Sequence, residues 1–452
     1  MIQFLTMADA KKTVLFEKHS ALTGKSQIVS FAGWLMPLWF KSQAREHEAV
    51  RKTAGLFDCT HMAVLGIRGK TAQDFLNILT TNDVSLLKPG KAQYSYILNF
   101  EGDIIDDVII YCFADDNYMM VANAANEQKV KDWINEISNL KFEISKDSSP
   151  HSTKQIEIKD LKNPSLPDAR VDIAIQGPVS AECLKNIFGA DFGGIKPFTF
   201  MQAKTRDFDP APAPHSCHNS GLACMPIPIL KNDKQIPAER IQSKCGVDVI
   251  ISRTGYTGAK IGFELFVHPS KAVQLWDVIL EKGKNLNVIP CGLASRDSLR
   301  IEAGLPLYGH ELAGEFNISP FQAGYGWAVK LQKPDFIGKK ALIKKAVDFK
   351  TEVARLEFDG VKGIRPIRQF DGILNKNGVC IGHILSCAGV GDKQIMLSLI
   401  EKQYNIVDNS VGVYYLARNQ SHIQQGRREK VNIGDSLTAD LAGKVIERFE
   451  KF

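Results

Sequence analysis

One ten-residue stretch decides the fold, because it combines the composition of a buried strand with two adjacent carboxylates: Ile104-Ile105-Asp106-Asp107-Val108-Ile109-Ile110-Tyr111-Cys112-Phe113. β-Branched and aromatic residues dominate this stretch, which predicts a strand and not a loop. Side chains alternate across a strand. We therefore expect one face to carry Ile105, Asp107, Ile109 and Tyr111, and the opposite face to carry Asp106, Val108, Ile110 and Cys112.

The two aspartates need an explanation, because both faces of the predicted strand look buried. A buried carboxylate is costly unless a partner compensates its charge. Either residue could be a structural cap at the mouth of the strand. Alternation allows only one of the two into a shared cavity, so Asp107 and Asp106 are alternatives for a functional carboxylate.

Helical and strand patterns alternate around this stretch. We expect helices over residues 42–54, 71–81 and 126–138, and strands over 62–70, 93–100, 104–113 and 118–123, with a hairpin at 99–103. A second series begins with the segment 171–178, followed by a helix over 179–188, strands over 247–253 and 262–268, a helix over 270–283 and the helix of Arg296. This order implies two related α+β units, with a largely antiparallel sheet covered by helices on one side.

Composition narrows the class of protein. The chain has 452 residues, 44% hydrophobic and 23% charged, which suits a globular protein of two or three domains. The formal charge of +6 is mild, and no basic cluster indicates nucleic-acid binding. It would suit an anionic ligand tail or an acidic protein partner. No apolar run reaches the roughly 18 residues of a membrane span.

The cysteines and the N-terminus predict a location. Nine cysteines are scattered without a Cys-x-x-Cys pair, and their number is odd. This pattern indicates reduced thiols in a cytosolic-type compartment, not a disulfide framework. Residues 1–9 lack a charged signal-peptide region and the Arg and Ser richness of a transit peptide. We expect a cytoplasmic protein, or a protein of the mitochondrial matrix if the source is eukaryotic.

Several different short segments follow one another along the chain in a distinctive order: Phe31-Ala32-Gly33-Trp34-Leu35-Met36-Pro37, Glu46-His47-Glu48-Ala49-Val50-Arg51, Gly55-Leu56-Phe57-Asp58-Cys59-Thr60-His61-Met62, Leu79-Thr80-Thr81-Asn82-Asp83-Val84, Gly90-Lys91-Ala92-Gln93-Tyr94-Ser95, Arg253-Thr254-Gly255-Tyr256-Thr257-Gly258, Gly262-Phe263-Glu264, Cys291-Gly292-Leu293-Ala294-Ser295-Arg296-Asp297-Ser298-Leu299-Arg300-Ile301-Glu302-Ala303-Gly304 and Leu307-Tyr308-Gly309-His310-Glu311. Together with the Asp-Asp strand they resemble the aminomethyltransferase (T-protein) family of the glycine cleavage system. The resemblance covers residues 11–340.

The resemblance implies an α+β fold with three domains in a cloverleaf around a central cavity. Two mixed α/β folate-binding domains would form a core of two interleaved units over residues 1–345, and a C-terminal β-barrel would occupy residues 346–452. It also implies the reaction. A lipoyl carrier protein (H-protein) presents an aminomethyl group, tetrahydrofolate takes up its methylene, and 5,10-methylenetetrahydrofolate and ammonia form. This chemistry needs tetrahydrofolate as a substrate and no metal.

Residues of about 205–244 have no counterpart in the family, whose members have a much shorter segment at this place. The segment begins Arg206-Asp207-Phe208-Asp209-Pro210 and is rich in proline, which predicts an extended surface insertion. Four residues of the two types that commonly bind zinc invite a zinc interpretation, although their spacing matches no common structural site: His215, Cys217, His218 and Cys224. We expect loop decoration.

The resemblance also implies site residues by motif position. Asp107 corresponds to the catalytic carboxylate beside the folate N5. The folate-pocket positions are Tyr94, Tyr111, Met62, Val121, Asn123, Tyr256, Glu264 and Arg296. Arg448 is a candidate for the folate tail, because the family's C-terminal segment has no clear match. Tyr94 and Tyr111 could instead be strand packing, Met62 and Val121 could be core, and Arg296 could pair with Asp297 or Glu302 on a helix surface. His47 and His61 are expected to be structural.

Two other functions stay open on the same scaffold. One is a folate-dependent demethylase acting on a small methylated sulfur or amine compound, because the pocket for the leaving group cannot be read from the sequence. The other is a non-catalytic folate-binding protein that supports iron–sulfur cluster assembly. Those relatives carry a Lys-Gly-Cys-x-x-Gly-Gln-Glu signature, whereas residues 303–311 here contain neither Lys nor Cys. This difference favours the aminomethyltransferase.

Overall fold

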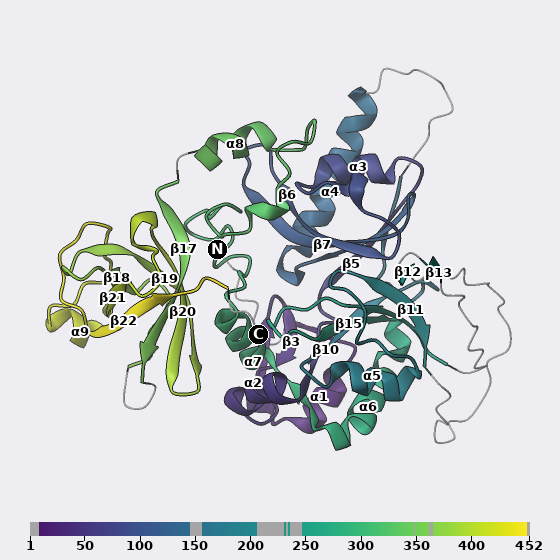
Figure 1. The fold of residues 1–452 in the computed structure, drawn as a ribbon, viewed down its shortest axis with the longest axis horizontal. Helices are drawn as coiled ribbons and strands as arrows, with labels where there is room; N and C mark the ends of the chain where they lie inside the picture. The colour runs from purple at the N-terminus through teal and green to yellow at the C-terminus, as the bar shows by residue number, and fades with distance from the viewer. Residues whose placement is uncertain are drawn as a thin grey trace.

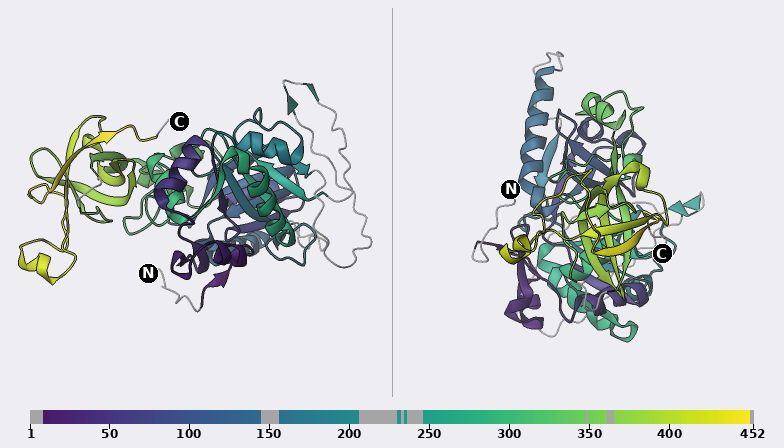
Figure 2. Two further views of the ribbon diagram at one scale, coloured as in Figure 1. Left: turned by 90° about the horizontal axis from the view of Figure 1, so that it is seen from below. Right: turned by 90° about the vertical axis from the view of Figure 1, so that its left-hand side faces the viewer.

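Three folded parts make up the molecule in a computed structural model, which describes residues 9–144, 156–205, 230–231, 234–235, 246–347, 349–360 and 365–449. Two sheet-and-helix units lie next to each other, and a barrel lies beside them (Figure 1). In a second view the barrel occupies one end of the long axis (Figure 2). The expected α+β cloverleaf with a C-terminal barrel is confirmed.

The first unit is a five-stranded antiparallel sheet that carries the Asp-Asp strand. Its strands, in spatial order, are β6 (Lys91–Leu98), β7 (Ile104–Ala114), β8 (Asn117–Ala122), β5 (Ala63–Arg68) and β9 (Glu157–Asp160). Helices α3 (Ala72–Leu79) and α4 (Glu127–Ile144) cover one face. Apolar side chains from both layers, such as Phe75, Ile110 and Ile134, form one buried core there.

The second unit is a six-stranded sheet. Its order is β11 (Phe200–Lys204), β14 (Asp248–Ser252), β15 (Gly262–Val267), β10 (Val171–Gln176), β4 (Ala54–Asp58) and β16 (Val288–Cys291). Helices α5 (Ser180–Phe188) and α6 (Ala272–Lys282) pack on one face around Trp276. Because β4 precedes the whole first unit in the chain, the two units are interleaved.

The uncovered faces of the two sheets pack against each other. Their shared core contains Val64, Tyr111 and Val121 from the first sheet. It also contains Phe200, Ile250 and Phe266 from the second sheet. The face of β7 that carries Tyr111 therefore looks toward the second sheet, with helices on the two outer surfaces. Any polar side chain on this inner face lies between the units.

The third part is a closed barrel. Its strands are, in spatial order, β17 (Thr351–Asp359), β20 (Lys393–Glu401), β19 (Cys380–Val390), β18 (Gly372–Leu374), β21 (Ser410–Tyr414) and β22 (Leu441–Ile446). Closure leaves no free sheet edge. The predicted domain boundary at residues 345–346 falls within helix α8 (Lys339–Val347) and stays a prediction.

The remaining elements frame these parts. Before β4 lie a small sheet of β1 (Lys11–Lys12), β3 (Trp34–Pro37) and β2 (Ile28–Phe31) and the helices α1 (Phe16–Leu22) and α2 (Gln43–Lys52). Ser42 begins α2 by accepting a hydrogen bond from the Arg45 N–H at 3.3 Å. Helix α7 (Leu293–Glu302) contacts β19 of the barrel, and α9 (Gln420–Gln424) lies within the barrel sequence.

The expected alternation on β7 fails at one position. Asp106 pairs with Ile97 and Ile104 pairs with Leu98, so Ile105 is an extra residue in a bulge. Ile105 consequently packs with Val108 and Ile110 in the helix-covered core, and not on the face of Tyr111. Alternation from Asp106 onward follows the prediction.

Parts of the predicted insertion lie outside the described residues, including His215, Cys217, His218 and Cys224. Two short strands, β12 (Leu230–Lys231) and β13 (Lys234–Gln235), are described within it. Over the described ranges, no helix combines the length and the apolar composition needed to cross a membrane.

Candidate active site

Three neighbouring strands bring the first polar group together. Asp107 lies on β7, Tyr94 lies on β6, and Asn123 follows the last residue of β8. The Tyr94 hydroxyl donates to Asp107 Oδ2 at 3.1 Å, and Asn123 Nδ2 donates to Asp107 Oδ1 at 2.8 Å. Tyr94 stands opposite Ile109, the residue two positions after Asp107, which puts both side chains on the same face.

Asp106 points away from this face. Its side chain is fully buried, and its carboxylate accepts the Asn123 N–H at 2.8 Å, Asn123 Nδ2 at 2.9 Å and Asn126 Nδ2 at 2.6 Å. Asp107 is only half-buried. Of the two carboxylates, Asp107 is therefore the one that a ligand could meet.

The pKa values of Asp107, Asp106 and Tyr94 all lie above the ordinary values of these groups. Burial raises the pKa of Asp107, although Tyr94 and Asn123 stabilise the ionised form. Burial and the neighbouring Asp107 charge also raise the pKa of Asp106. Burial, together with Asp107, holds the pKa of Tyr94 well above its usual range, so its hydroxyl keeps its proton. A carboxylate with a raised pKa is a stronger base than an ordinary aspartate, which suits a group that accepts a proton from a substrate.

A second polar group lies on the inner face of the other sheet. Glu264 on β15 accepts a hydrogen bond from the Thr254 hydroxyl and another from the Tyr111 hydroxyl at 3.3 Å. The Tyr111 side chain is fully buried, with its ring centroid 5.5 Å from that of Phe200 and 5.2 Å from that of Phe266. Tyr111 thus combines strand packing with a polar contact across the two sheets.

Arg296 belongs to this second group. Its Nη1 donates to Cys59 Sγ at 2.9 Å, and its guanidinium lies 5.6 Å from the centre of the Tyr256 ring. The Tyr256 hydroxyl donates to Pro306 O at 2.6 Å. Burial alone would lower the pKa of Arg296, but the neighbouring acidic groups Cys59, Glu264 and Asp172 raise it.

The surface ion-pair alternative for Arg296 is wrong. Asp297 instead accepts from Arg300 Nε at 2.8 Å. Glu302 accepts from Arg51 Nε at 2.7 Å. Both carboxylates that could have held Arg296 on the helix surface have other partners, and Arg296 turns inward from α7.

The two apolar candidates connect the sheets. Val121 is 8% exposed and lies in the core between the sheets. Met62 packs against that core and also against a second cluster around Phe57 and Leu299. Both residues are core by packing, and their contact with folate stays a prediction.

Arg448 donates no hydrogen bond to either polar group among the described residues, but it interacts with Tyr325, whose ring centroid lies 5.7 Å from that of Tyr94. Its guanidinium donates to the carbonyl oxygens of Gly304 and Ala323 and lies 4.6 Å from the Phe449 ring centre. Burial lowers its pKa to about 10. The arginine thus ties the chain after the barrel to the loop that follows α7. Its predicted role at the folate tail stays a prediction.

Two aromatic residues beside Tyr94 were missed by the sequence reasoning. The ring centroids of Tyr325 and Trp327 each lie 5.7 Å from that of Tyr94. Trp327 is 52% exposed, which is unusual for a side chain this large. The signal in the sequence was the aromatic pair inside the glycine-rich run Gly324-Tyr325-Gly326-Trp327.

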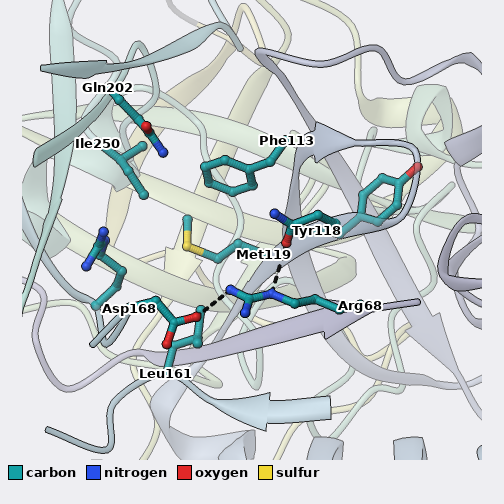
Figure 3. Close-up of a pocket in the computed structure, with 10 residues that line it drawn as sticks. Arg68, Phe113, Tyr118, Met119, Leu161, Asp168, Gln202 and Ile250 are labelled. Carbon is teal, nitrogen blue, oxygen red and sulfur yellow. Dashed lines mark hydrogen bonds and ion pairs between the residues drawn. The ribbon is translucent and has the colours of Figure 1, made fainter. Parts of the chain in front are cut away.

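A cavity of about 100 Å³ lies elsewhere between the two sheets (Figure 3). Its lining includes Arg68, Phe113, Met119, Asp168 and Ile250, and none of the predicted site residues. Arg68 pairs with Asp168 and donates to Asn117 Oδ1 at 3.1 Å. The charged groups drawn there thus have partners within the protein. Among the described residues, no three His, Cys, Asp or Glu side chains gather as metal ligands would.

Known proteins resemble this chain over most of its length. A family described as the GCVT N-terminal domain matches residues 15–216 and 235–333. An aminomethyltransferase of Thermoanaerobacter sp. (strain X514) is 37% identical over 338 residues, which is 75% of each chain. Another, of Caldanaerobacter subterraneus subsp. tengcongensis, is 35% identical over 412 residues, covering 90% of this chain and 92% of that one. The crystal structure of glycine cleavage system aminomethyltransferase T from Bartonella henselae superposes with a TM-score of 0.69 at 25% identity, covering 98% of both chains.

Proposed function

The chain belongs to the GCVT aminomethyltransferase family, and from this premise we propose that it transfers the methylene of a lipoyl-bound aminomethyl group to tetrahydrofolate. The reaction consumes the aminomethyl thioether in its ammonium form and tetrahydrofolate. It yields the free lipoyl thiol, 5,10-methylenetetrahydrofolate and ammonium. The proposed partner is the lipoyl carrier protein of the glycine cleavage system.

The observation that carries this proposal is the environment of Asp107. N5 of the folate forms a bond to the methylene carbon while the carbon–sulfur bond breaks, and positive charge develops on nitrogen. A carboxylate beside that nitrogen stabilises the charge and can accept the N5 proton. Two hydrogen bonds hold the Asp107 carboxylate in place, from Tyr94 and from Asn123.

The second polar group supplies what recognition of a flat, polar heterocycle requires. Arg296 offers a planar fork of donors, and Glu264 offers acceptors. Tyr256 places an aromatic face next to the guanidinium. Asp107 and Glu264 lie on the two sheets, and Arg296 turns inward from α7, so a ligand held between the sheets could contact donors and acceptors on either side. This arrangement supports tetrahydrofolate as the substrate.

The test is the formation of 5,10-methylenetetrahydrofolate by the purified chain from tetrahydrofolate and an aminomethyl-loaded lipoyl carrier. We expect product only when carrier and folate are both present. Small N-methylated amines and methylated sulfur compounds, supplied without the carrier, test the demethylase. Product from those compounds, with none from the carrier, would overturn the proposal.

A further inference from the structure

We propose that Asp106 is a positioning residue: it fixes the orientation of the Asn123 amide, so that the amide nitrogen holds Asp107 and the amide oxygen accepts an N–H of the substrate. This role rests on the proposed function, because that reaction supplies the substrate N–H. Asp106 itself touches no reacting atom in this account. It acts through Asn123.

The contacts of Asp106 are all with N–H donors of one short segment. Two of them come from Asn123, one through its backbone and one through its side chain, and the third comes from Asn126. Asn123 and Asn126 begin and end the single turn of 3₁₀ helix that follows β8. A fully buried carboxylate therefore anchors this turn to β7.

The Asn123 amide is held in one orientation. Its Nδ2 donates to Asp106 Oδ1 at 2.9 Å and to Asp107 Oδ1 at 2.8 Å. An amide nitrogen has two hydrogens, and each has a carboxylate oxygen. A flipped amide would put its carbonyl oxygen against both aspartates and lose the two hydrogen bonds that its nitrogen donates to them. Asn123 Nδ2 also lies 3.4 Å from the backbone oxygen of Asp107, so Asp106 and Asp107 together select the state in which Asn123 supports Asp107.

The same orientation leaves Asn123 Oδ1 without a hydrogen-bond partner among the described residues, on a half-buried side chain. An amide oxygen accepts and cannot donate, so its complement on a ligand is an N–H. The ammonium of the lipoyl-bound aminomethyl group is such a donor, and so is a folate ring N–H. Together Asn123 Oδ1 and Asp107 form an acceptor pair that suits a primary ammonium.

A double-mutant cycle separates this role from simple packing. The variants are Asp106→Asn, Asn123→Ala and the pair, with Asn126→Ala as a matched control that removes one bond to Asp106 and leaves the Asn123 amide intact. We expect Asp106→Asn to lower kcat about 10- to 100-fold, the range for leaving one buried hydrogen-bonding group without its partner. The dissociation constant of tetrahydrofolate should change less than kcat, and the melting temperature should fall because Asp106 also anchors the turn, so kcat is compared where every variant is folded. Asn126→Ala should lose much less activity.

The coupling between Asp106→Asn and Asn123→Ala shows whether Asp106 acts through Asn123. If Asp106 acts through Asn123, Asp106→Asn should have almost no further effect in the Asn123→Ala background. Effects that multiply would overturn the proposal, and so would wild-type kcat in Asp106→Asn. If Asp106→Asn does not fold, Asn123→Ala still tests the proposal. A wild-type kcat in Asn123→Ala would overturn it, because Asp106 is proposed to act only through Asn123.

An NMR measurement keeps this inference distinct from the proposed function. The side-chain amide protons of Asn123, labelled with ¹⁵N-asparagine and assigned by their loss in Asn123→Ala, should exchange slowly in the wild-type chain. They should exchange faster in Asp106→Asn and not in Asn126→Ala. If this exchange pattern is found but the wild-type chain is inactive in the transfer assay, the proposed reaction is wrong and the role of Asp106 in orienting Asn123 still holds. Unchanged exchange in Asp106→Asn would overturn the positioning itself.

Discussion

At the scale of single residues, Arg296 joins ligand recognition to the charge balance of the second polar group. Arg296→Ala should weaken tetrahydrofolate binding at least about tenfold, because removing one partner of a desolvated contact costs about 2–5 kcal/mol. Arg296→Lys should restore only part of the affinity, since a point charge cannot reproduce a planar fork. Calorimetric titration of folate measures both.

The control for Arg296 is Arg45→Ala on α2, an exposed arginine. It should leave both folate affinity and melting temperature unchanged. Normal folate binding by Arg296→Ala, together with a much lower melting temperature, would show that Arg296 is structural.

Trp327 provides a second test at this scale. Its exposed ring lies beside Tyr94, which binds Asp107. If folate occupies this site, its aromatic system will contact or shield the indole and change its fluorescence. Trp327→Phe should remove most of the fluorescence change on folate binding. Trp133→Phe, at a ring that packs on Phe100, should leave the change intact, and the reverse result would place folate elsewhere.

The residues show where sequence reasoning reaches its limit. The Asp-Asp pair is visible in the sequence, and strand alternation separates Asp107 from Asp106. Neighbouring positions on a strand are local information. The amide that bridges the two carboxylates comes from the end of another strand, and Trp327 comes from a loop more than 200 residues further on. Such contacts depend on the packing of whole elements.

At the scale of elements, a buried hydrogen bond attaches the N-terminal α1 to β4. His19 Nε2 lies 2.9 Å from Asp58 Oδ2, and Thr13 donates to the same oxygen at 2.9 Å. Burial alone would raise the pKa of Asp58, but His19 and the other donors lower it to about 2. An unfolded aspartate has a pKa of about 3.9.

This difference predicts the direction of a pH effect. Because the folded pKa lies below the unfolded one, Asp58 stabilises the folded chain above about pH 4, and the contribution disappears as the pH falls through about 2. The shift corresponds to roughly 2–3 kcal/mol. Asp58→Asn should lower the free energy of unfolding at pH 7 by at least this amount. Between pH 4 and pH 3, Asp58→Asn should lose less free energy of unfolding than the wild-type chain loses.

Urea unfolding at pH 7, 4 and 3 measures the Asp58 effect. Asp277→Asn is the control, since its ion pair with Lys18 is about half exposed and should contribute about 0–1 kcal/mol. Equal losses for Asp58→Asn and Asp277→Asn would contradict the account.

The sequence predicted helices and strands better than it predicted contacts between residues that are distant along the chain. Periodicity placed α3, α5 and α6 and the strands β5 to β8, β14 and β15 within a few residues, because amphipathic spacing reflects burial directly, whereas β4, β9, β11 and β16 were not predicted. The bulge at Ile105 was not predictable, since it depends on the register with β6. The place of β4 in the second sheet was equally hidden, because β4 pairs with β10 and β16, both more than 110 residues away.

At the scale of the whole molecule, one buried arginine connects the core to the barrel. Arg300 on α7 is 1% exposed and donates to Glu311 at 2.6 Å and to Ser386 of β19 at 2.8 Å. Arg300→Met should destabilise the chain by about 3–5 kcal/mol, because Glu311 would keep a buried charge without its partner. Ser386→Ala should cost only about 1–3 kcal/mol.

Thermal unfolding of both variants and limited proteolysis at the junction measure this connection. Arg300→Met should melt below Ser386→Ala and expose the barrel junction to protease. An Arg300→Met variant that melts like the wild-type chain would contradict the claim that this pair holds the parts together. The barrel itself was expected from family resemblance alone, because strand patterns cannot show closure.

The most direct test of the central claim is single-turnover transfer from a preloaded lipoyl carrier to saturating tetrahydrofolate, in the wild-type chain and in Asp107→Asn. The account predicts that Asp107→Asn keeps its folate affinity and melting temperature. Its transfer rate should fall about 30- to 1000-fold, equivalent to roughly 2–4 kcal/mol in the barrier. A near-wild-type transfer rate in Asp107→Asn would contradict the account, because the charge beside N5 would then have no part in the reaction.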